Sequence, residues 1–435
     1  MTRPGGVWRN WARTERVRPR RVEYPPTVEA VRRAVQAAAQ RGLRVKAVGA
    51  GHSFTGIAVA PDVLLVLDDL TGLVEVDAAR QRVRLLAGTR LHRIPALLAP
   101  HGLAMQNLGD IDRQSLAGAI STGTHGTGLA FGGLATQVVG ATIVTADGEL
   151  LRVEEGDPEL PAVALGLGAL GILVDVTLQC VPAFGLAAVE RPQPLAQAVD
   201  GFAGHAASVD HFELYWFPHT DVALTKTHTR LTDGEARAPL SAAQRWRDDV
   251  LVGGGVHAVA CAAGRVVPAA VPAINSLSAR VWGGRTFSDA SHRVFASPRA
   301  VRFREMEYAV PLDRLSAAFD AVRLVIDAGR ERIEFPIEMR AAAGDDRWLS
   351  TAHGRDSGYI AVHRMRGADH RRYFAAVEEV LRAFDGRPHW GKLHSLTATE
   401  LAPLYPRFAD FVALRDRLDP TRRFANAYLE RVLGE

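Results

Sequence analysis

Two glycine-flanked turns, each containing a histidine, constrain this chain more than any other feature. They lie at residues 48–54 (VGAGHSF) and 119–128 (AISTGTHGTG). Glycine adopts positive φ easily and leaves backbone N–H groups uncovered, so such turns approach a phosphate or a flat ring closely. Two of them in one half of the chain predict a site for a large cofactor. The alternative is a pair of ordinary turns with solvated histidines.

The first turn also begins like the fingerprint of a nicotinamide-binding Rossmann fold. Gly49 and Gly51 follow the strand-like segment 45–48, as that fingerprint requires. Phe54, however, stands where a third glycine is needed for close packing of helix on strand. A nicotinamide site is therefore disfavoured.

Composition and charge narrow the class of protein. The chain has 435 residues, 47% hydrophobic and 23% charged, enough for a sizeable core and two or more domains. Basic side chains number 52 against 48 acidic ones, a net charge of +4, without a long block of one sign. This balance argues against a nucleic-acid partner. The basic run at 16–21 is interpreted as a solvated arm, with phosphate contacts as the open alternative.

Cysteine content and hydropathy bear on location. Cys180 and Cys261 are too few and too far apart for a disulfide framework or a zinc site, which favours a reducing compartment. The N-terminus lacks the apolar core of a signal peptide, and the apolar stretch 161–174 is short for a membrane span. We expect a cytoplasmic protein with no integral membrane segment, and loose membrane association stays open.

We expect no metal, because His52 and His125 lack the ligand spacing of a metal-dependent hydrolase.

Hydrophobic spacing predicts mixed helices and strands. A helix is expected from Val28 to Gly42, since Thr27 supplies an N-cap and apolar residues recur on one face. A second helix is expected at 89–99. From about 186 we expect an antiparallel sheet backed by helices, with a helical tract near 241–250. Strands are expected at 45–48, 64–67, 74–76, 83–85, 141–145 and 150–153, the last two joined by an Asp147-Gly148 hairpin.

Further motifs carry a resemblance to a known family. Besides the two turns, the chain contains NLGDI at 107–111, RPHWGK at 387–392, and DP at 419–420 with FANA at 424–427. Together they resemble flavoproteins of the vanillyl-alcohol-oxidase type. Within these, the closest resemblance is to the sugar-1,4-lactone oxidases and dehydrogenases (gulonolactone and arabinonolactone oxidases), with alditol oxidase as near kin.

This resemblance implies an α+β fold, with a two-part FAD-binding domain of the vanillyl-alcohol-oxidase type and an α+β substrate (cap) domain. The implied division is 1–185 for the FAD-binding domain and 186–386 for the substrate domain. Residues 387–435 would then form a C-terminal segment that returns to the FAD domain and the active site.

The resemblance also implies FAD as the cofactor, joined through a ring nitrogen of His52 to its 8α-methyl group. No cysteine lies near 119–128 or 160–175, so a second, cysteinyl link is not expected. His125 is interpreted as structural.

In relatives the residue equivalent to Gly109 lines the approach to the flavin. Glycine at this position leaves a path for O2, which predicts oxidase activity. The residues expected at the cofactor are Gly49, Ala50, Gly51, His52, Ser53, Phe54, Asn107, Gly109, Asp110, Gly118, Ser121, Thr122, Gly123, Thr124, His125, Gly126, Gly171 and Ile172.

One predicted strand, 332–340, brings candidate catalytic residues together. Its odd positions are apolar, while Glu334, Glu338 and Arg340 share the other face. A half-solvated strand with a surface ion pair explains this pattern equally well. The resemblance favours catalysis, because family members hold a Glu-x-Arg pair over the reactive edge of the flavin. Lys392 joins them, as one of only three lysines among 52 lysines and arginines and as part of the family's His-Trp-Gly-Lys motif.

We therefore predict that FAD takes a hydride from an aldono-1,4-lactone, such as L-gulono- or L-galactono-1,4-lactone, giving an ascorbate-type product. Arg340 and Lys392 would stabilise the developing negative charge, and Glu338 would bind substrate hydroxyls and orient Arg340. The electron acceptor is O2 or another acceptor. Asp110 stands where alditol-oxidising relatives carry serine. The alternatives are an alditol (polyol) oxidase that produces an aldose and hydrogen peroxide, and a flavin-free binding protein.

Overall fold

Strand β5 (Val45–Val48), which leads into the first histidine turn, lies at one edge of a small sheet. The computed structural model describes residues 2–4, 6–232, 234–247, 257–281, 284–297, 301–329 and 331–435. Over these residues the larger sheets have four, five and eight strands. The four-stranded sheet has the order β1 (Thr2–Pro4), β4 (Arg21–Glu23), β6 (Val63–Val66) and β5, and its last three strands are parallel.

The predicted first helix is α1 (Val28–Ala39), which covers this sheet. The Thr27 hydroxyl caps it by accepting a hydrogen bond from the backbone N–H of Ala30 at 3.1 Å, as expected. Its apolar face is buried in the same core as the sheet residues Val45, Val63 and Leu65, so burial of this stripe holds helix and sheet together.

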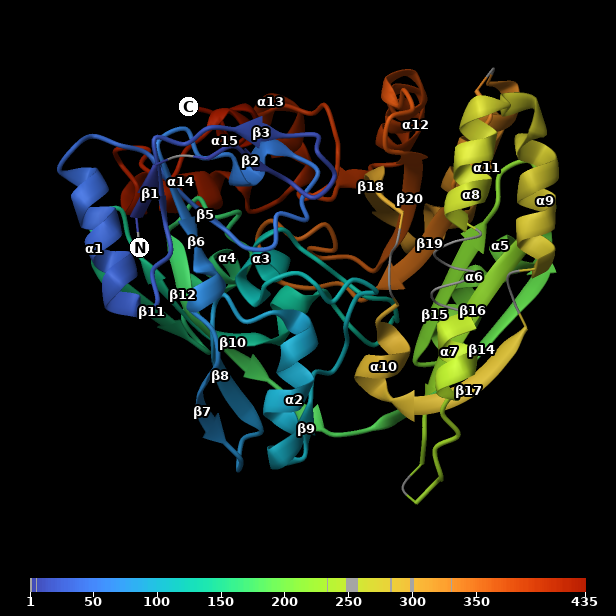
Figure 1. Cartoon of the computed structure of the whole chain (residues 1–435), viewed down its shortest axis with the longest axis horizontal. Helices are drawn as coiled ribbons and strands as arrows, with labels where there is room; N and C mark the ends of the chain where they lie inside the picture. The colour runs from blue at the N-terminus through green and yellow to red at the C-terminus, as the bar shows by residue number, and fades with distance from the viewer. Residues whose placement is uncertain are drawn as a thin grey trace.

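The five-stranded sheet is antiparallel and lies beside the first one (Figure 1). The predicted hairpin is confirmed: Gly148 has φ +86°, and Thr145 N–H donates to the Glu149 carbonyl at 2.9 Å. The predicted helix at 89–99 is a shorter α2 (Ile94–Leu98) between single helical turns. In spatial order the strands are β11 (Leu150–Glu154), β10 (Val138–Val144), β12 (Ile172–Gln179), β8 (Arg82–Leu86) and β7 (Leu73–Asp77).

The eight-stranded antiparallel sheet forms the other lobe, on the right of Figure 1. Its spatial order is β17 (Arg285–Ala290), β14 (Gly185–Pro194), β16 (Val222–Arg230), β15 (His211–Trp216), β19 (Ile337–Ala342), β20 (Ser357–Met365), β18 (Phe303–Pro311) and β21 (Arg387–Pro388). Helices α5 (Leu195–Asp200), α6 (Phe202–Ser208), α11 (Leu315–Ala328) and α12 (Arg371–Ala383) pack on it. The antiparallel sheet backed by helices is therefore confirmed.

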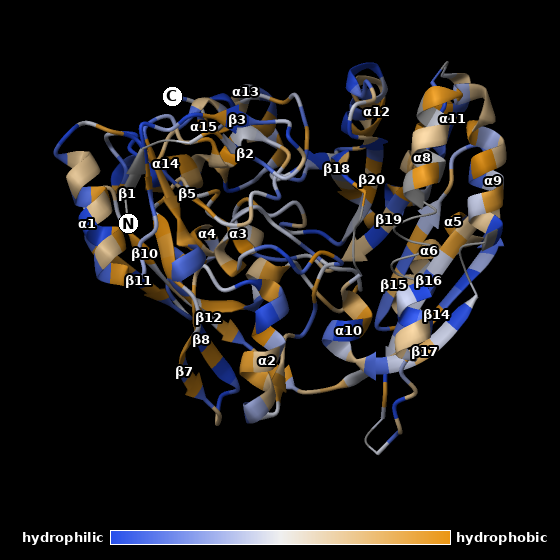
Figure 2. Cartoon of the chain, in the orientation of Figure 1, coloured by the Kyte–Doolittle hydropathy of each residue, from blue (hydrophilic) through white to orange (hydrophobic). Residues whose placement is uncertain are grey.

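The two faces of this sheet differ in chemistry. Cross-strand register places Tyr215 opposite Glu338, and places Leu214 opposite Met339 on the reverse face. The reverse face is apolar and packs on the helices, and residues of both faces are buried in β15 and β19. We call the other side the polar face, and it carries Glu213, Tyr215, Lys226, Glu305, Glu307, Glu338, Arg340 and His363. By contrast, the central strands β8, β10 and β12 of the five-stranded sheet are predominantly hydrophobic (Figure 2).

The remaining elements are short or peripheral. The predicted helical tract near 241–250 contains α7 (Ala242–Arg245), and positions 248–250 lie outside the described residues. No helix in the described parts of the chain is both long and apolar enough to cross a membrane. The other elements are β2 (Trp8–Arg9), β3 (Arg16–Val17), β9 (Leu103–Ala104), β13 (Val181–Pro182), α3 (Leu116–Ser121), α4 (Leu160–Ala164), α8 (His257–Val266), α9 (Val271–Val281), α10 (Ser291–Phe295), α13 (Ala398–Leu401), α14 (Phe408–Leu418) and α15 (Ala427–Leu433).

The end of the chain returns to the first sheet and to the segment that follows the first histidine turn. The Val45 N–H donates to the Arg423 carbonyl at 2.8 Å, and Asn426 donates to the carbonyls of Gly56, Ile57 and Val59. These bonds fix the C-terminal motif against the first histidine turn. The domain boundaries at 185/186 and 386/387 stay a prediction.

Candidate active site

A cleft runs along the end of β5 and past the first histidine turn. It encloses about 1010 Å³ of empty space, which includes solvent at its open mouth. The expected cofactor residues that line it are Gly49, Ala50, Gly51, His52, Ser53, Gly118, Ser121, Thr122, Gly171 and Ile172. The other expected ones lie outside this lining: Phe54, Asn107, Gly109, Asp110, Gly123, Thr124, His125 and Gly126.

Glycine is required in the first turn for two separate reasons. A Cβ on Gly49 would lie 1.9 Å from the Ser115 hydroxyl oxygen, and Ser115 caps helix α3. Gly51 has φ +67°, a backbone conformation that other residues rarely adopt. The turn therefore packs directly on α3 and presents bare backbone to the cleft.

The lining fits FAD. Its walls include the apolar side chains of Ile57, Leu167 and Leu170, which suit flat aromatic rings, and glycines expose N–H groups for a pyrophosphate. Lys46 is the one lysine, arginine or carboxylate among the described lining residues, and its ammonium donates to the carbonyls of Gly168 and Phe424, both at 3.0 Å. Burial lowers the pKa of Lys46 to about 7. The turns at 49–53 and 166–171 would hold the cofactor chiefly through their backbone.

His52 lies on the lining of this cleft and is half-buried. Its ring stacks on Trp11, with centroids 5.5 Å apart and planes 25° apart. Burial, and then the positive charge of Arg90, lower the pKa of the His52 imidazole to about 4. The ring is therefore neutral at physiological pH, with a nitrogen lone pair available as a nucleophile.

The second histidine turn connects the cleft to the polar face. Gln114, which lines the cleft, donates to the Thr124 hydroxyl at 3.0 Å. Farther along, the Thr127 hydroxyl donates to the Phe212 carbonyl at 2.5 Å, and Gly128 N–H donates to Ala341 at 2.8 Å. The loop therefore binds the ends of β15 and β19.

Arg340 lies at the centre of an acidic cluster on the polar face. Its guanidinium contacts Asp110 at 2.7 Å and Glu213 at 2.8 Å, and forms a very close ion pair with Glu338. The Tyr215 hydroxyl lies within 3.0 to 3.3 Å of all three carboxylates. Burial alone would lower the pKa of Arg340, but these carboxylates raise it well above its ordinary value. Glu338 and Arg340 are thus brought together, and Asp110 joins them rather than the cleft lining.

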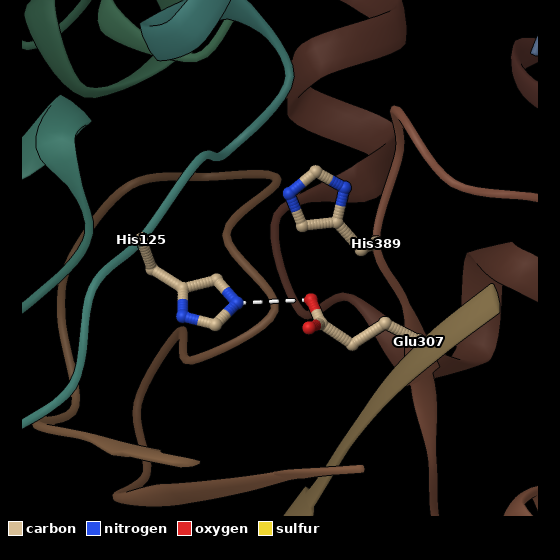
Figure 3. A group of neighbouring side chains, drawn as sticks. All are labelled: His125, Glu307 and His389. Carbon is tan, nitrogen blue, oxygen red and sulfur yellow. Dashed lines mark hydrogen bonds and ion pairs between the residues drawn. The ribbon is translucent and has the colours of Figure 1, made fainter. Parts of the chain in front are cut away.

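Lys392 lies in a second cluster of the same face. Its ammonium contacts Glu305 at 2.6 Å and Glu307 at 2.7 Å, and Glu307 also accepts from His125 at 2.9 Å. Figure 3 shows His125 and Glu307 joined by this bond, with the His389 ring beside them. Burial lowers the pKa of Lys392, but the neighbouring carboxylates outweigh it and raise that pKa above its ordinary value.

The segment that carries Lys392 also touches both histidine turns. The His389 N–H donates to the Glu307 carbonyl and the Leu393 N–H to the Glu305 carbonyl, so residues 390–392 bulge between two bonds to β18. Within this bulge the Gly391 carbonyl accepts from Phe54 N–H at 2.6 Å. A Cβ on Gly391 would lie 3.3 Å from Ser53 Oγ and 3.4 Å from Thr122 Oγ1. The bulge therefore places Lys392 between the cleft and the polar face.

The predicted strand at 332–340 is partly wrong. Strand β19 begins only at Ile337, where its ladder with β15 starts, and continues to Ala342. Glu334 precedes the strand and forms a close ion pair with Arg364, so it does not join Glu338 and Arg340. The interpretation as a half-solvated strand is also wrong, since every residue of β19 is buried.

Several residues of these clusters were missed from the sequence. Four of them, Glu213, Tyr215, Glu305 and Glu307, lie in strands where polar and apolar residues alternate, the same signal that selected Glu338 and Arg340. Lys226 and His363 lie in strands without this alternation, and His389 follows β21. In residues 303–310 (FREMEYAV) the glutamates alternate with Met306 and Tyr308, and residues 211–216 (HFELYW) show the same pattern. The missed residues are Glu213, Tyr215, Lys226, Glu305, Glu307, His363 and His389.

Two groups of side chains in the described residues are spaced as metal ligands would be. They are Asp110, Glu213 and Glu338, and His125, Glu307 and His389. The first already surrounds Arg340, and in the second Glu307 already pairs with Lys392. A fixed guanidinium or ammonium among the carboxylates opposes a metal ion there, so neither group fits a metal site.

Comparison with known proteins places this geometry in a family. Residues 176–432 match the family described as D-arabinono-1,4-lactone oxidase, and residues 19–154 match the FAD binding domain. The chain belongs to the D-arabinono-1,4-lactone oxidase family. It is therefore an FAD-dependent oxidoreductase of the lactone oxidase and dehydrogenase group, as the motifs predicted.

Relatives within this family align over nearly the whole chain. The L-gulono-1,4-lactone dehydrogenase of Mycobacterium tuberculosis (strain ATCC 25618 / H37Rv) is 41% identical over 98% of this chain and 99% of its own. The L-gulonolactone oxidase of Bos taurus is 33% identical, and the alditol oxidase of Streptomyces sp. 31%, each over 98% of both chains. The solved cholesterol oxidase of Brevibacterium sterolicum matches 100% of this chain and 97% of its own with a TM-score of 0.84 at 17% identity, which confirms the predicted fold.

Proposed function

We propose that this member of the D-arabinono-1,4-lactone oxidase family oxidises an aldono-1,4-lactone of the L-gulono or L-galactono type to an ascorbate-type product. The full-length similarity to proteins named L-gulono-1,4-lactone dehydrogenase and L-gulonolactone oxidase supports this substrate class. The observation that carries the proposal is the pairing of Asp110 with Arg340 at 2.7 Å. It brings into the site the aspartate at a position where the resemblance implies serine in alditol-oxidising relatives, and Gly109-Asp110 is nearer to the lactone-oxidising pattern.

Bound FAD supplies the hydride acceptor. The protein must bind the lactone, orient its C–H bond and stabilise the alkoxide that develops as the hydroxyl loses its proton. Arg340 and Lys392 are the central cations of the two clusters on the polar face, and both stay charged because carboxylates surround them. Glu338 fixes Arg340 and offers an acceptor for a substrate hydroxyl. Positive charge that is fixed in advance stabilises an alkoxide without reorganisation.

We also propose that His52 carries the FAD covalently. Its place on the cleft lining and its neutral ring suit a bond from a ring nitrogen to the 8α-carbon. That bond would replace a C–H bond of the methyl group, with protons lost from this carbon and from the ring nitrogen and the two electrons taken up by the flavin. The residues that would hold the flavin are those of the two turns and of 166–172.

For the domain organisation we propose the FAD-binding segment 1–185, the substrate segment 186–386 and the returning segment 387–435. We propose a cytoplasmic location, which the two-cysteine content supports.

The electron acceptor is a separate question, because relatives include both dehydrogenases and oxidases. We propose oxidase activity, in line with glycine at position 109. A Cβ on Gly109 would lie 2.9 Å from the His125 carbonyl oxygen, so substitution there also displaces the second turn. A direct measurement is therefore needed: reduced wild-type enzyme mixed with air-saturated buffer should be reoxidised within the turnover time and release hydrogen peroxide.

The substrate class is tested by anaerobic mixing of the holoenzyme with a panel of aldono-1,4-lactones and alditols, while the visible flavin absorbance is followed. We expect L-gulono- or L-galactono-1,4-lactone to bleach the flavin fastest. Faster bleaching by an alditol would overturn the proposal in favour of the second candidate, an alditol oxidase. The 31% identity to a protein of that name is the reason for this second candidate. Slow reoxidation in air, with fast turnover on an artificial dye, would identify a dehydrogenase.

A further inference from the structure

Lys392 belongs to a chain of alternating charges that the sequence did not reveal. Its ammonium lies between Glu305 and Glu307, at 2.6 and 2.7 Å, and each carboxylate continues to a histidine. Glu307 accepts from His125 at 2.9 Å, and Glu305 from His363 at 3.3 Å. We call these five residues the Lys392 clamp. The two glutamates come from one strand, β18. His363 comes from the neighbouring strand β20, and His125 comes from the second histidine turn.

Both histidines of the clamp have an oxygen atom beside each ring nitrogen. His125 Nδ1 lies 2.8 Å from the Gly126 carbonyl, and His363 Nδ1 lies 3.0 Å from the Pro336 carbonyl. A carbonyl oxygen only accepts, so both Nδ1 atoms must donate. The Nε2 atoms face carboxylates, which also accept when ionised. Each ring is therefore held between two oxygen atoms, one beside each ring nitrogen.

The carboxylates and cations of the two clusters are in direct contact. The carboxylates are Asp110, Glu213, Glu305, Glu307 and Glu338, and the cations are Lys226, Arg340 and Lys392. Each of these carboxylates thus has a cation partner, as burial of a charge requires.

Titration behaviour agrees with the geometry. Burial would raise the pKa of both glutamates, but Lys392 and the histidines lower the pKa of Glu305 to about 2 and hold that of Glu307 well below its ordinary value. Around Lys392 the facing groups are Glu305 and Glu307 from β18, Glu338 from β19 and His389 from its own segment. His389 is uncharged, because burial and then Lys392 lower its pKa to about 3.

We propose that Glu305 and Glu307 are positioning residues of the active site, which keep Lys392 charged and direct its third N–H toward the substrate. An ammonium has three donors, and the glutamates take two of them. In the described part of the chain no third acceptor is found for Lys392, whose side chain is 18% exposed. The role in catalysis rests on the proposed function, whereas the charge state of Lys392 does not.

The clamp is tested directly by NMR of holoenzyme labelled with ε-13C lysine. The chain has three lysines, Lys46, Lys226 and Lys392, so the spectrum has three side-chain signals, each assigned by a lysine-to-arginine variant. In the wild type the Lys392 signal should remain at its charged position to the alkaline limit of the folded protein. In Glu307→Gln and in Glu305→Gln its titration midpoint should fall by about 1 to 3 pH units, the effect of losing one close opposite charge.

Glu378→Gln is the matched control. Glu378 is buried like the clamp glutamates and accepts from Tyr308 on the reverse face of β18 and from Ser395 N–H. Its loss should lower stability without moving the Lys392 midpoint. The proposal is overturned if wild-type Lys392 titrates at or below an ordinary lysine value, or if the clamp variants and Glu378→Gln leave its midpoint equally unchanged.

A kinetic arm separates the clamp from the proposed function. In Glu307→Gln the rate of flavin reduction should fall as pH rises through the lowered Lys392 midpoint, a limb that the wild type lacks. Adding Lys392→Arg should remove that limb, because a guanidinium stays charged, although the rate itself is low. If no lactone reduces the wild-type flavin, the proposed function fails while the NMR result still decides the clamp. A limb that persists with Lys392→Arg would contradict the role of Lys392.

Discussion

His52 lies where a covalent bond to FAD would form, and its ring is neutral because burial lowers its pKa to about 4. We expect acid-precipitated wild-type protein to keep its yellow colour in the pellet, since a covalent bond survives unfolding. His52→Ala should release all flavin to the supernatant. The exposed His101 offers a matched control, and His101→Ala should retain the colour. Complete release of flavin from the wild type would disprove the covalent bond.

Arg340 and Lys392 are expected to act as distinct cations. Arg340→Lys should slow flavin reduction by about 10²-fold or more, the effect of removing one charge-stabilising group, because a point charge cannot replace its fork between Asp110 and Glu213. Lys392→Arg should be similarly slow, because a planar guanidinium does not fit between Glu305 and Glu307. Stopped-flow reduction by the lactone measures both rates.

Arg364 provides the control for these substitutions. It lies on strand β20, where it points to the reverse face from its neighbour His363, and it forms an ion pair with Glu334. Arg364→Lys should therefore leave the rate of flavin reduction unchanged within about twofold, the rate equivalent of the small effects expected at independent sites. Near-normal reduction by Lys392→Arg would show that Lys392 only supports the fold.

Among the structural elements, the turn after β5 depends most on glycine. Gly49→Ala would place a Cβ 1.9 Å from Ser115 Oγ and push the turn away from the cap of α3. We expect this variant to fold with lower stability and little bound flavin, measured as the ratio of visible to ultraviolet absorbance. Gly204→Ala, in helix α6 with no atom near its Cβ, should bind flavin normally. Full flavin content in Gly49→Ala would show that the turn does not shape the cofactor site.

Local patterns predicted the elements that carry their own signals. The Thr27 cap, the period of α1 and the Asp147-Gly148 turn all depend on contacts within a few residues, and all three are confirmed. Strand β19 was misplaced because its start is set by pairing with β15, which lies more than 100 residues away in the sequence. Alternation within one strand carries no information about such a partner.

The candidate site was partly predictable for the same reason. Motifs selected Glu338, Arg340 and Lys392, which the structure places in two clusters of one face. The partners Glu213 and Glu307 were missed, although they alternate with apolar residues in β15 and β18. Alternation shows which side chains of one strand point to the same face of the sheet. Only the strand order shows which strands are neighbours, and that order is set by long-range pairing across the sheet.

Across the whole molecule, buried neutral histidines should govern stability in acid. Burial is the largest cause in each case, and it lowers the pKa of His52 and His211 to about 4 and of His389 and His394 to about 3. In the unfolded chain the same rings titrate near 6.5, so the unfolded state binds more protons between these values. Stability is therefore complete above pH 6.5 and falls as pH drops toward 3.

This expectation is measured by urea unfolding of the holoenzyme at a series of pH values. The free energy of unfolding should decline progressively below pH 6.5, and the slope gives the number of protons taken up on unfolding. His394→Gln, which removes one buried ring beside Tyr428, should make that slope shallower, while His101→Gln on the surface should not change it. Glu305 and Glu307 add a further loss only below about pH 4.5, since their folded pKa values are lowered instead. Constant stability between pH 6.5 and 4.5 would show that these histidines are charged in the folded protein.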